Sequence, residues 1–259
     1  MKQHIITIQV YLSFFLCLLL FADQSLGQNA TDSLQEPNQR KNVIRYNLSG
    51  ALLFGFDKFI VFGYERVIRR NQSISVNFGK AALPTIVSIV TDSFEVKRQG
   101  ESKGTNFSID YRFYLQKENK FLPPHGLYIG PYYSYNHFTR ENQWDHTNSS
   151  NTSYVTSHSE LNIHTIGFEL GYQFIFWKKL TLDLLMVGPG LGFYNYKASF
   201  DSNLSAANKE QLLQGLQQLL TQKFPGFNYV FSDKKLDANG TLNATAGGYR
   251  YLMQLGFNF

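Results

Sequence analysis

The most regular feature of this chain is an alternation of apolar and polar residues with a period of two, which is strongest over residues 247–259. Small, polar or charged residues fill the positions between the apolar ones. A period of two predicts a β-strand with two chemically different faces. The apolar face of this last strand carries Tyr249, Tyr251, Met253, Leu255, Phe257 and Phe259.

The same alternation recurs seven times earlier in the chain. The predicted strands cover residues 43–52, 60–65, 73–79, 106–115, 126–138, 159–177, 180–199 and 247–259. Most approach the length of about 9–11 residues that a tilted strand needs to cross a bilayer. Short connections alternate with long ones, and this alternation is typical of bacterial outer-membrane barrels. Only the connection after the first strand departs from it. The sequence therefore predicts an all-β fold, an eight-stranded antiparallel up-and-down transmembrane β-barrel spanning residues 42–259.

The long connections fall into three segments, 80–103, 140–157 and 200–245. The second is dense in Asn, Ser and Thr and is predicted to be a polar loop. The first contains an apolar stretch, 81–90, which could extend a strand or cover the barrel mouth. The third is predicted to contain an amphipathic helix over 205–224 that ends at Pro225-Gly226. Its apolar face is formed by Leu212, Leu213, Leu216, Leu219, Leu220 and Phe224. This helix could cap its own barrel, lie on the outer leaflet or dock a partner.

The N-terminus has the features of a secretory signal. Lys2 precedes a nearly continuous apolar run over 5–22, and Ser25-Leu26-Gly27 offers small residues for cleavage. Residues 1–27 are therefore predicted to be a signal peptide, and the polar residues 28–41 a disordered periplasmic lead-in. Cys17 is the only cysteine, so the exported chain has no disulfide. Aromatic residues make up 16% of the chain, which suits a barrel with interfacial aromatic girdles.

Charge and candidate chemistry narrow the function further. The net charge of +5 is spread along the chain, and no basic run suggests a nucleic-acid partner. His158 and His164 are six residues apart, which is about 20 Å along a strand and too far to share a metal ion. Ser157 and His158 are adjacent and point to opposite faces of a strand, so they are badly placed for acyl hydrolysis. The sequence predicts no enzymatic activity, no cofactor and no metal.

The charged residues on the predicted inward face are the most informative set. An eight-stranded barrel is only wide enough to be filled by side chains, and charges buried there must pair and form hydrogen bonds. The first and last strands must be neighbours if the barrel closes, so we expect Arg45 or Arg250 to pair with a carboxylate from Glu65, Asp110, Glu169 or Asp183. A narrow gated pore is the alternative interpretation. The predicted lumen network consists of Arg45, Glu65, Asp110, Arg112, Glu169, Asp183 and Arg250.

Several local patterns carry a family resemblance: residues 62–66 (FGYER) followed by 73–75 (SIS), and residues 188–192 (GPGLG). With the closing strand, they make the chain resemble the small eight-stranded outer-membrane proteins of Gram-negative bacteria, the OmpA/OmpW-like superfamily, and most of all the uncharacterised barrels common in Bacteroidetes. The resemblance implies an outer-membrane location, contact with outer-membrane lipid and lipopolysaccharide, and recognition of the closing strand by the barrel assembly machinery. The implied insertion signal is formed by Tyr249, Tyr251, Phe257 and Phe259.

The expected function is a structural, adhesive or envelope-interaction role with a side-chain-filled lumen. A narrow OmpW-like channel for small solutes is the second hypothesis, and an outer-membrane lipid deacylase is the third. The sequence does not specify an extracellular partner or an oligomeric state.

Overall fold

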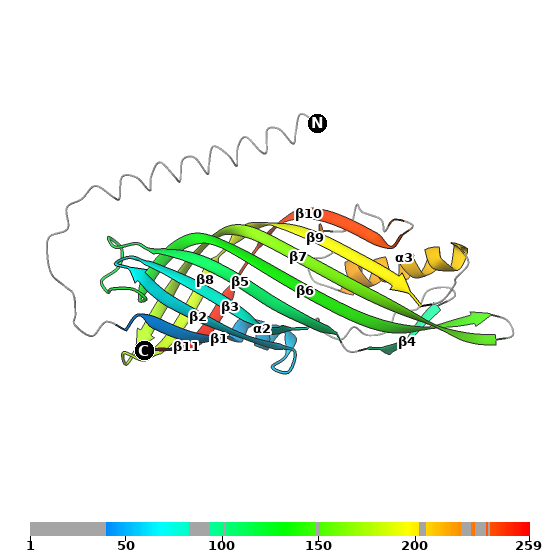
Figure 1. Ribbon diagram of the computed structural model, residues 1–259, viewed down its shortest axis with the longest axis horizontal. Coiled ribbons are helices and arrows are strands. Elements are labelled where there is room, and N and C mark those ends of the chain that lie inside the picture. Colours follow the sequence, from blue (N-terminus) through cyan, green and yellow to red (C-terminus); the bar gives the residue numbers. More distant parts are fainter. Residues whose placement is uncertain are drawn as a thin grey trace, which may run out of the picture. The chain divides into compact units, whose positions relative to one another are not determined.

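The computed structural model of the protein describes residues 40–82, 94–100, 102–148, 151–201, 206–223, 229–230, 237 and 239–259 (Figure 1). The predicted signal peptide and residues 28–39 of the predicted lead-in lie outside this part of the chain. So does most of the apolar segment 81–90. The described elements are β1 (Asn42–Asn47), α2 (Leu48–Phe54), β2 (Phe59–Arg69), β3 (Gln72–Ala81), β4 (Phe94–Gln99), β5 (Lys103–Tyr114), β6 (Gly126–Asn148), β7 (Asn151–Phe176), β8 (Leu180–Val187), β9 (Pro189–Phe200), α3 (Ala206–Lys223), β10 (Thr241–Tyr249) and β11 (Leu252–Asn258).

These strands form a closed, all-antiparallel barrel of eight strands, which confirms the predicted fold class. β8 and β9 are the two halves of one barrel strand interrupted at Gly188, and β10 and β11 are the halves of another, interrupted at Arg250 and Tyr251. Closure occurs between the first and last strands, where Ile44 pairs with Phe257 in an antiparallel register. Within the described residues, no helix is long and apolar enough to cross a membrane.

We call the part of the barrel between the short turns and the polar row described below the lower barrel. Alternation of inward and outward side chains gives it an apolar outer surface and a polar interior. Outward-facing side chains include Phe62, Phe78, Ile109, Phe113, Ile166, Phe168, Leu191, Phe193, Leu255 and Phe257, all of which are exposed. Further along the strands this outer surface becomes polar within two residues. One continuous row of paired residues marks the change, crossing five strands through Thr105, His137, Asn162, Asn195 and Asn243.

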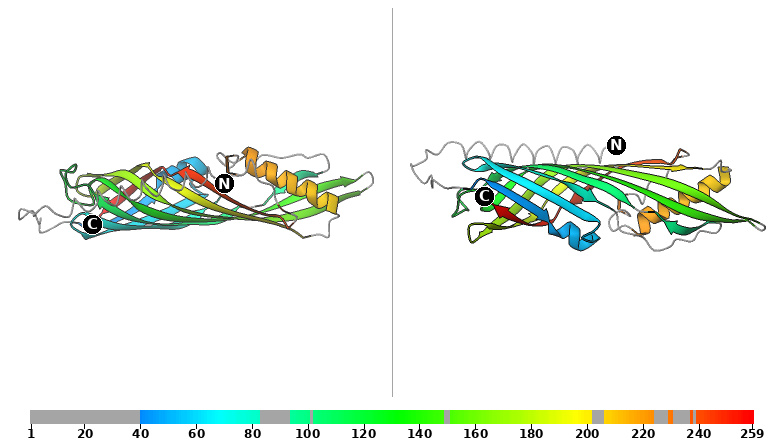
Figure 2. Two further views of the ribbon diagram at one scale, coloured as in Figure 1. Left: turned by 90° about the horizontal axis from the view of Figure 1, so that it is seen from above. Right: turned by 60° about the horizontal axis from the view of Figure 1, so that its bottom comes forward.

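At and beyond this polar row, β6, β7, β9 and β10 continue as a sheet that we call the distal sheet (residues 136–148, 151–163, 194–200 and 241–244). Its inner face is apolar, and α3 packs against it; both views in Figure 2 place the helix along one face of these strands. Leu212 and Leu216 of α3 are buried beside Trp144 and Tyr196. Inside and outside therefore exchange polarity at the row: charge lies inside the lower barrel, and an apolar core lies inside the distal sheet.

The structure corrects four sequence predictions. Residues 48–52, predicted to continue the first strand, belong to helix α2, whose N-cap Asn47 accepts a hydrogen bond from the backbone N–H of Gly50 at 3.1 Å. The predicted loop 140–157 is mostly strand, because β6 and β7 pair up to residues 148 and 151. The predicted connections 80–103 and 200–245 contain, respectively, β4 and the start of β10. Finally, the end of the predicted disordered lead-in is held by the barrel, since the Lys41 carbonyl accepts from the backbone N–H of Val67 at 2.8 Å.

Candidate functional site: a buried charge network in the barrel

The structure brings all seven predicted lumen charges together in the lower barrel. They come from six elements or their ends: β1, β2, β5, β7, β8 and the break between β10 and β11. The four carboxylates and two of the guanidinium groups are at most 2% exposed. Only Arg250 keeps a modest exposure, with 13% of its side chain accessible. The interior at this level is thus occupied by charged side chains that are paired with one another.

Arg112 is the centre of this network. Its guanidinium nitrogens lie 2.9 Å from Asp183, 3.3 Å from Glu65, 3.5 Å from Glu169 and 3.8 Å from Asp110. The guanidinium also lies over the ring of Tyr128, 4.2 Å from its centroid, which adds a cation–π contact. A planar guanidinium with five N–H donors can address several acceptors at once, which a lysine ammonium cannot do in the same geometry.

Arg45 lies at the closing seam and has room because its neighbours in both adjacent strands are glycines. Gly63 and Gly256 are its register partners. A Cβ atom on Gly256 would come within 2.7 Å of Arg45 Cγ. The extended side chain donates to Asp183 at 2.6 Å and to Glu65 at 3.0 Å. The predicted pairing of Arg45 with a lumen carboxylate is therefore confirmed, and Arg45 contacts two carboxylates, those of Asp183 and Glu65.

Arg250 lies at the break between β10 and β11 and contacts the network from there. Its Nη1 donates to Asp110 at 2.7 Å and to Glu169 at 3.3 Å, and its Nη2 donates to Ser108 at 3.0 Å. The guanidinium lies 4.8 Å from the ring centroid of Tyr132. Arg45 and Arg250 therefore serve different carboxylates, and Arg112 contacts all four.

The network contains four carboxylates and three guanidinium groups, so its formal charge is negative by one. The contacts of Glu169 are the longest: its Oε1 accepts no hydrogen bond, and its nearest cation contacts are 3.3 and 3.5 Å. Asp183, by comparison, accepts from two guanidinium groups and from the Tyr128 hydroxyl. Glu169 is therefore the most weakly held carboxylate of the set.

Uncharged polar residues complete the network and were absent from the predicted site. Ser75 accepts from Arg45 and donates to Asp110 at 3.1 Å, and Tyr114 donates to Glu65 at 2.7 Å. Gln173 accepts from Arg45 at 3.1 Å. Each occupies the same parity along its strand as the inward charges, so strand parity was the sequence signal that could have identified them. Because burying an unsatisfied polar group is costly, these residues contribute to holding the charges in place.

The histidine and serine candidates do not assemble a reactive site. Ser157 is fully buried on the inner face of the distal sheet and accepts from Trp144 Nε1 at 2.8 Å. His158 points outward and contacts Asp201 at 2.9 Å. Among the described residues there is no group of His, Cys, Asp and Glu side chains that could hold a metal ion.

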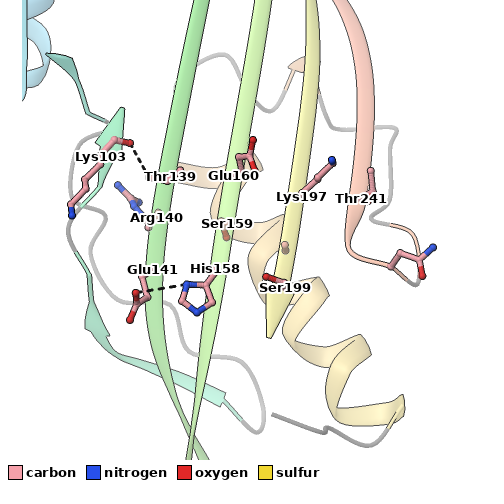
Figure 3. Close-up of a pocket in the computed structure, with 12 residues that line it drawn as sticks. Lys103, Thr139, Arg140, Glu141, His158, Ser159, Glu160, Lys197, Ser199 and Thr241 are labelled. Atoms are coloured by element: carbon pink, nitrogen blue, oxygen red, sulfur yellow. Dashed lines mark hydrogen bonds and ion pairs between the residues drawn. The ribbon is translucent and has the colours of Figure 1, made fainter. Parts of the chain in front are cut away.

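A polar groove of about 560 Å³ lies on the outer face of the distal sheet (Figure 3). Its floor is a second row of paired residues beyond the polar row: Lys103, Thr139, Glu160, Lys197 and Thr241. His158 and Glu141 line its far side, 3.7 Å apart. The groove contains side chains of both charge signs together with hydroxyl groups, so it presents a mixed polar surface to solvent.

The remaining predicted residues lie at the barrel seam and on α3. Tyr249, Tyr251, Phe257 and Phe259 all point outward and are exposed. Leu212, Leu213 and Leu216 form the buried face of α3. The side chains of Leu219, Leu220 and Phe224 lie outside the described part of the structure.

Comparison with protein-family models, with characterised proteins and with solved structures found no match to this chain. The class of the protein is therefore defined by its own geometry. It is a closed eight-stranded β-barrel whose lower interior holds a buried ionic network, extended by a sheet with a helix on its inner face.

Proposed function

We propose that this protein is an outer-membrane β-barrel with a structural, adhesive or envelope-interaction role, whose lumen is closed by its charge network. The observation that carries the proposal is the exchange of polarity at the polar row. An apolar outer surface with a paired polar interior suits hydrocarbon outside, whereas a polar outer surface over an apolar core suits water outside.

The distal sheet is then the part that faces the environment, and contacts with other envelope or extracellular molecules are proposed for it. Outer-membrane lipid, including lipopolysaccharide, would surround the apolar band. The barrel assembly machinery would engage the outward aromatics of the closing strand, as the resemblance to the OmpA/OmpW-like superfamily implies.

Cell fractionation and bilayer recordings test the proposal. The full chain expressed in a Gram-negative host should be recovered in the outer membrane and run with heat-modifiable mobility on gels. In planar bilayers the purified barrel should give no stable single-channel steps. Steps in the wild type that disappear when lumen charges are replaced would favour the narrow-channel hypothesis instead. Recovery in a soluble fraction would refute the membrane assignment.

A further inference from the structure

The end of the barrel formed by the short turns carries a distinctive set of side chains. We call this end the turn rim, defined by residues 40–41, 69–72, 115–125 and 177–179. Backbone hydrogen bonds bring these segments to one level: Tyr114 N–H donates to Asn71, and Asn258 N–H donates to Lys179, both at 2.7 Å. Arg40 also donates to the Lys178 carbonyl at 2.6 Å. The turn rim therefore forms a continuous ring around the barrel end.

This ring is strongly basic. Its only acidic side chain is that of Glu118, and among the described residues none of its cations forms an ion pair with a carboxylate side chain. Its cations are Arg40, Lys41, Arg69, Arg70, Lys117, Lys120, Lys178 and Lys179, all exposed except the half-buried Arg40. At the opposite end, the outward lysines of the polar groove, Lys103 and Lys197, line the same groove as Glu141 and Glu160. The positive charge is thus concentrated at one end of the barrel.

Exposed aromatic side chains lie beside these cations. Trp177 is 85% exposed in the same turn as Lys178 and Lys179. The aromatics near the turn rim are Phe113, Phe121, Phe176, Trp177, Phe257 and Phe259. Aromatic rings concentrate at the depth of lipid headgroups, and lysine or arginine next to an anionic membrane surface is attracted to its phosphates. The ring therefore combines both chemical features of a headgroup-binding surface.

We propose that the turn rim binds the anionic phospholipid headgroups of the leaflet that it faces. This inference rests on the proposed membrane location of the barrel. A soluble anionic polymer would require a basic face directed away from the membrane. Here the cations instead surround the whole barrel end and are accompanied by outward aromatics at the border of the apolar band.

Trp177 provides a local reporter for this proposal, because the only other tryptophan, Trp144, is fully buried in the distal sheet. The Trp144→Phe barrel would be reconstituted in vesicles that mix anionic phosphatidylglycerol with zwitterionic phosphatidylcholine, with only one of the two lipids brominated. Quenching of Trp177 then measures which lipid is enriched beside it. Wild-type protein, with Trp177→Phe as its blank, gives the same measurement should Trp144→Phe fold poorly.

We expect brominated phosphatidylglycerol to be preferred about fivefold at low salt, the effect of one cation held near an anionic surface, and the preference to shrink as ionic strength rises. The rim triple variant Arg70→Gln, Lys178→Asn, Lys179→Gln should lose it. Asparagine is chosen at position 178 because Lys178 has a φ of 63°, which asparagine tolerates. The matched triple variant Lys80→Gln, Lys103→Gln, Lys197→Gln should keep it.

Equal quenching by the two brominated lipids, or a preference that survives in the rim triple variant, would overturn the inference and leave the membrane barrel intact. Absence of quenching by either lipid would show that Trp177 does not contact a membrane, and the proposed function itself would fail.

Discussion

Arg112 offers the sharpest test of the buried network, because it is the one cation that contacts all four carboxylates. In the Arg112→Gln variant, four buried carboxylates would face only Arg45 and Arg250. Removing one partner of a buried ion pair costs about 3–5 kcal/mol, since the remaining charge stays desolvated. We therefore expect the free energy of unfolding to fall by about 3–5 kcal/mol. Arg112→Lys should recover only part of this loss, because an ammonium group is a compact point charge without the planar fork.

The matched control is Lys103→Gln, which removes a cation from the exposed start of the same strand, β5. Its expected cost is below about 1 kcal/mol, because charges on exposed side chains contribute little to stability. Unfolding by urea in lipid vesicles, followed by tryptophan fluorescence, measures both variants on one scale. If Arg112→Gln and Lys103→Gln lose equally little, the charges of the lower barrel face water, and the assignment of its inside and outside is wrong.

Three further predictions concern single groups. In the same urea assay, Glu169→Gln should lower the free energy of unfolding by only about 1 kcal/mol, and Asp183→Asn by about 3 kcal/mol or more. The reason is that the network has one negative charge in excess and Glu169 has the longest cation contacts. The reverse order would contradict this ranking. Leu216→Ala should cost about 2–5 kcal/mol by opening a cavity under α3, seen as faster proteolysis within the distal sheet, whereas Gln214→Ala on the exposed face of α3 should leave the cleavage rate unchanged. Burial raises the pKa of Tyr196 to about 12. Its contribution to stability should therefore be complete below the ordinary tyrosine pKa of about 10 and be lost as the pH rises through 12. Subtracting the phenolate absorbance of Tyr196→Phe from that of wild type should show the ionisation of Tyr196, and a midpoint near pH 10 would contradict the prediction.

Strand parity explains how much of the charge network could be predicted from sequence. In a strand, residues two apart share a face, so the apolar outward positions of β5 fixed Asp110 and Arg112 as inward neighbours. Parity does not show which inward charges meet across the lumen. That depends on strand tilt and register, and only the folded barrel shows that Arg112 reaches Glu65 and Asp183 on other strands.

The short helix α2 was missed because its spacing satisfies two periods at once. Leu48 and Leu52 are four residues apart, which keeps a strand face at a period of two and a helix face at i, i+4. The deciding feature is local: the Asn47 side chain caps the backbone N–H of Gly50, and this cap starts the helix. Gly55, with a φ of 103°, then ends it in a conformation that favours glycine.

The distal sheet escaped prediction for a different reason. In β7 the apolar residues change parity, from Leu161 and Ile163 on the inner face to Ile166 and Phe168 on the outer face. The predicted strand 159–177 already spans this change of parity, so the part that was missed lies further along the sheet, in the predicted loop 140–157. The polar residues there have the composition of a loop, although they are the water-facing side of a paired sheet. Composition alone does not distinguish these two environments.

The change of parity also explains why the chain carries α3. Where the outer surface of the strands becomes polar, their apolar side chains turn inward, and the strands of the distal sheet cannot cover that inner face by themselves. The helix supplies the missing layer, and Leu212 and Leu216 occupy the space that charged groups fill lower in the barrel. The same strands therefore enclose two different interiors. Where their outer surface is apolar, the interior is a paired ionic network; where their outer surface is polar, the interior is apolar and covered by the helix. Loss of the α3 contacts should therefore unfold the distal sheet and leave the ionic lower barrel folded. Although the two cores share strands, apolar packing holds one and ion pairs hold the other.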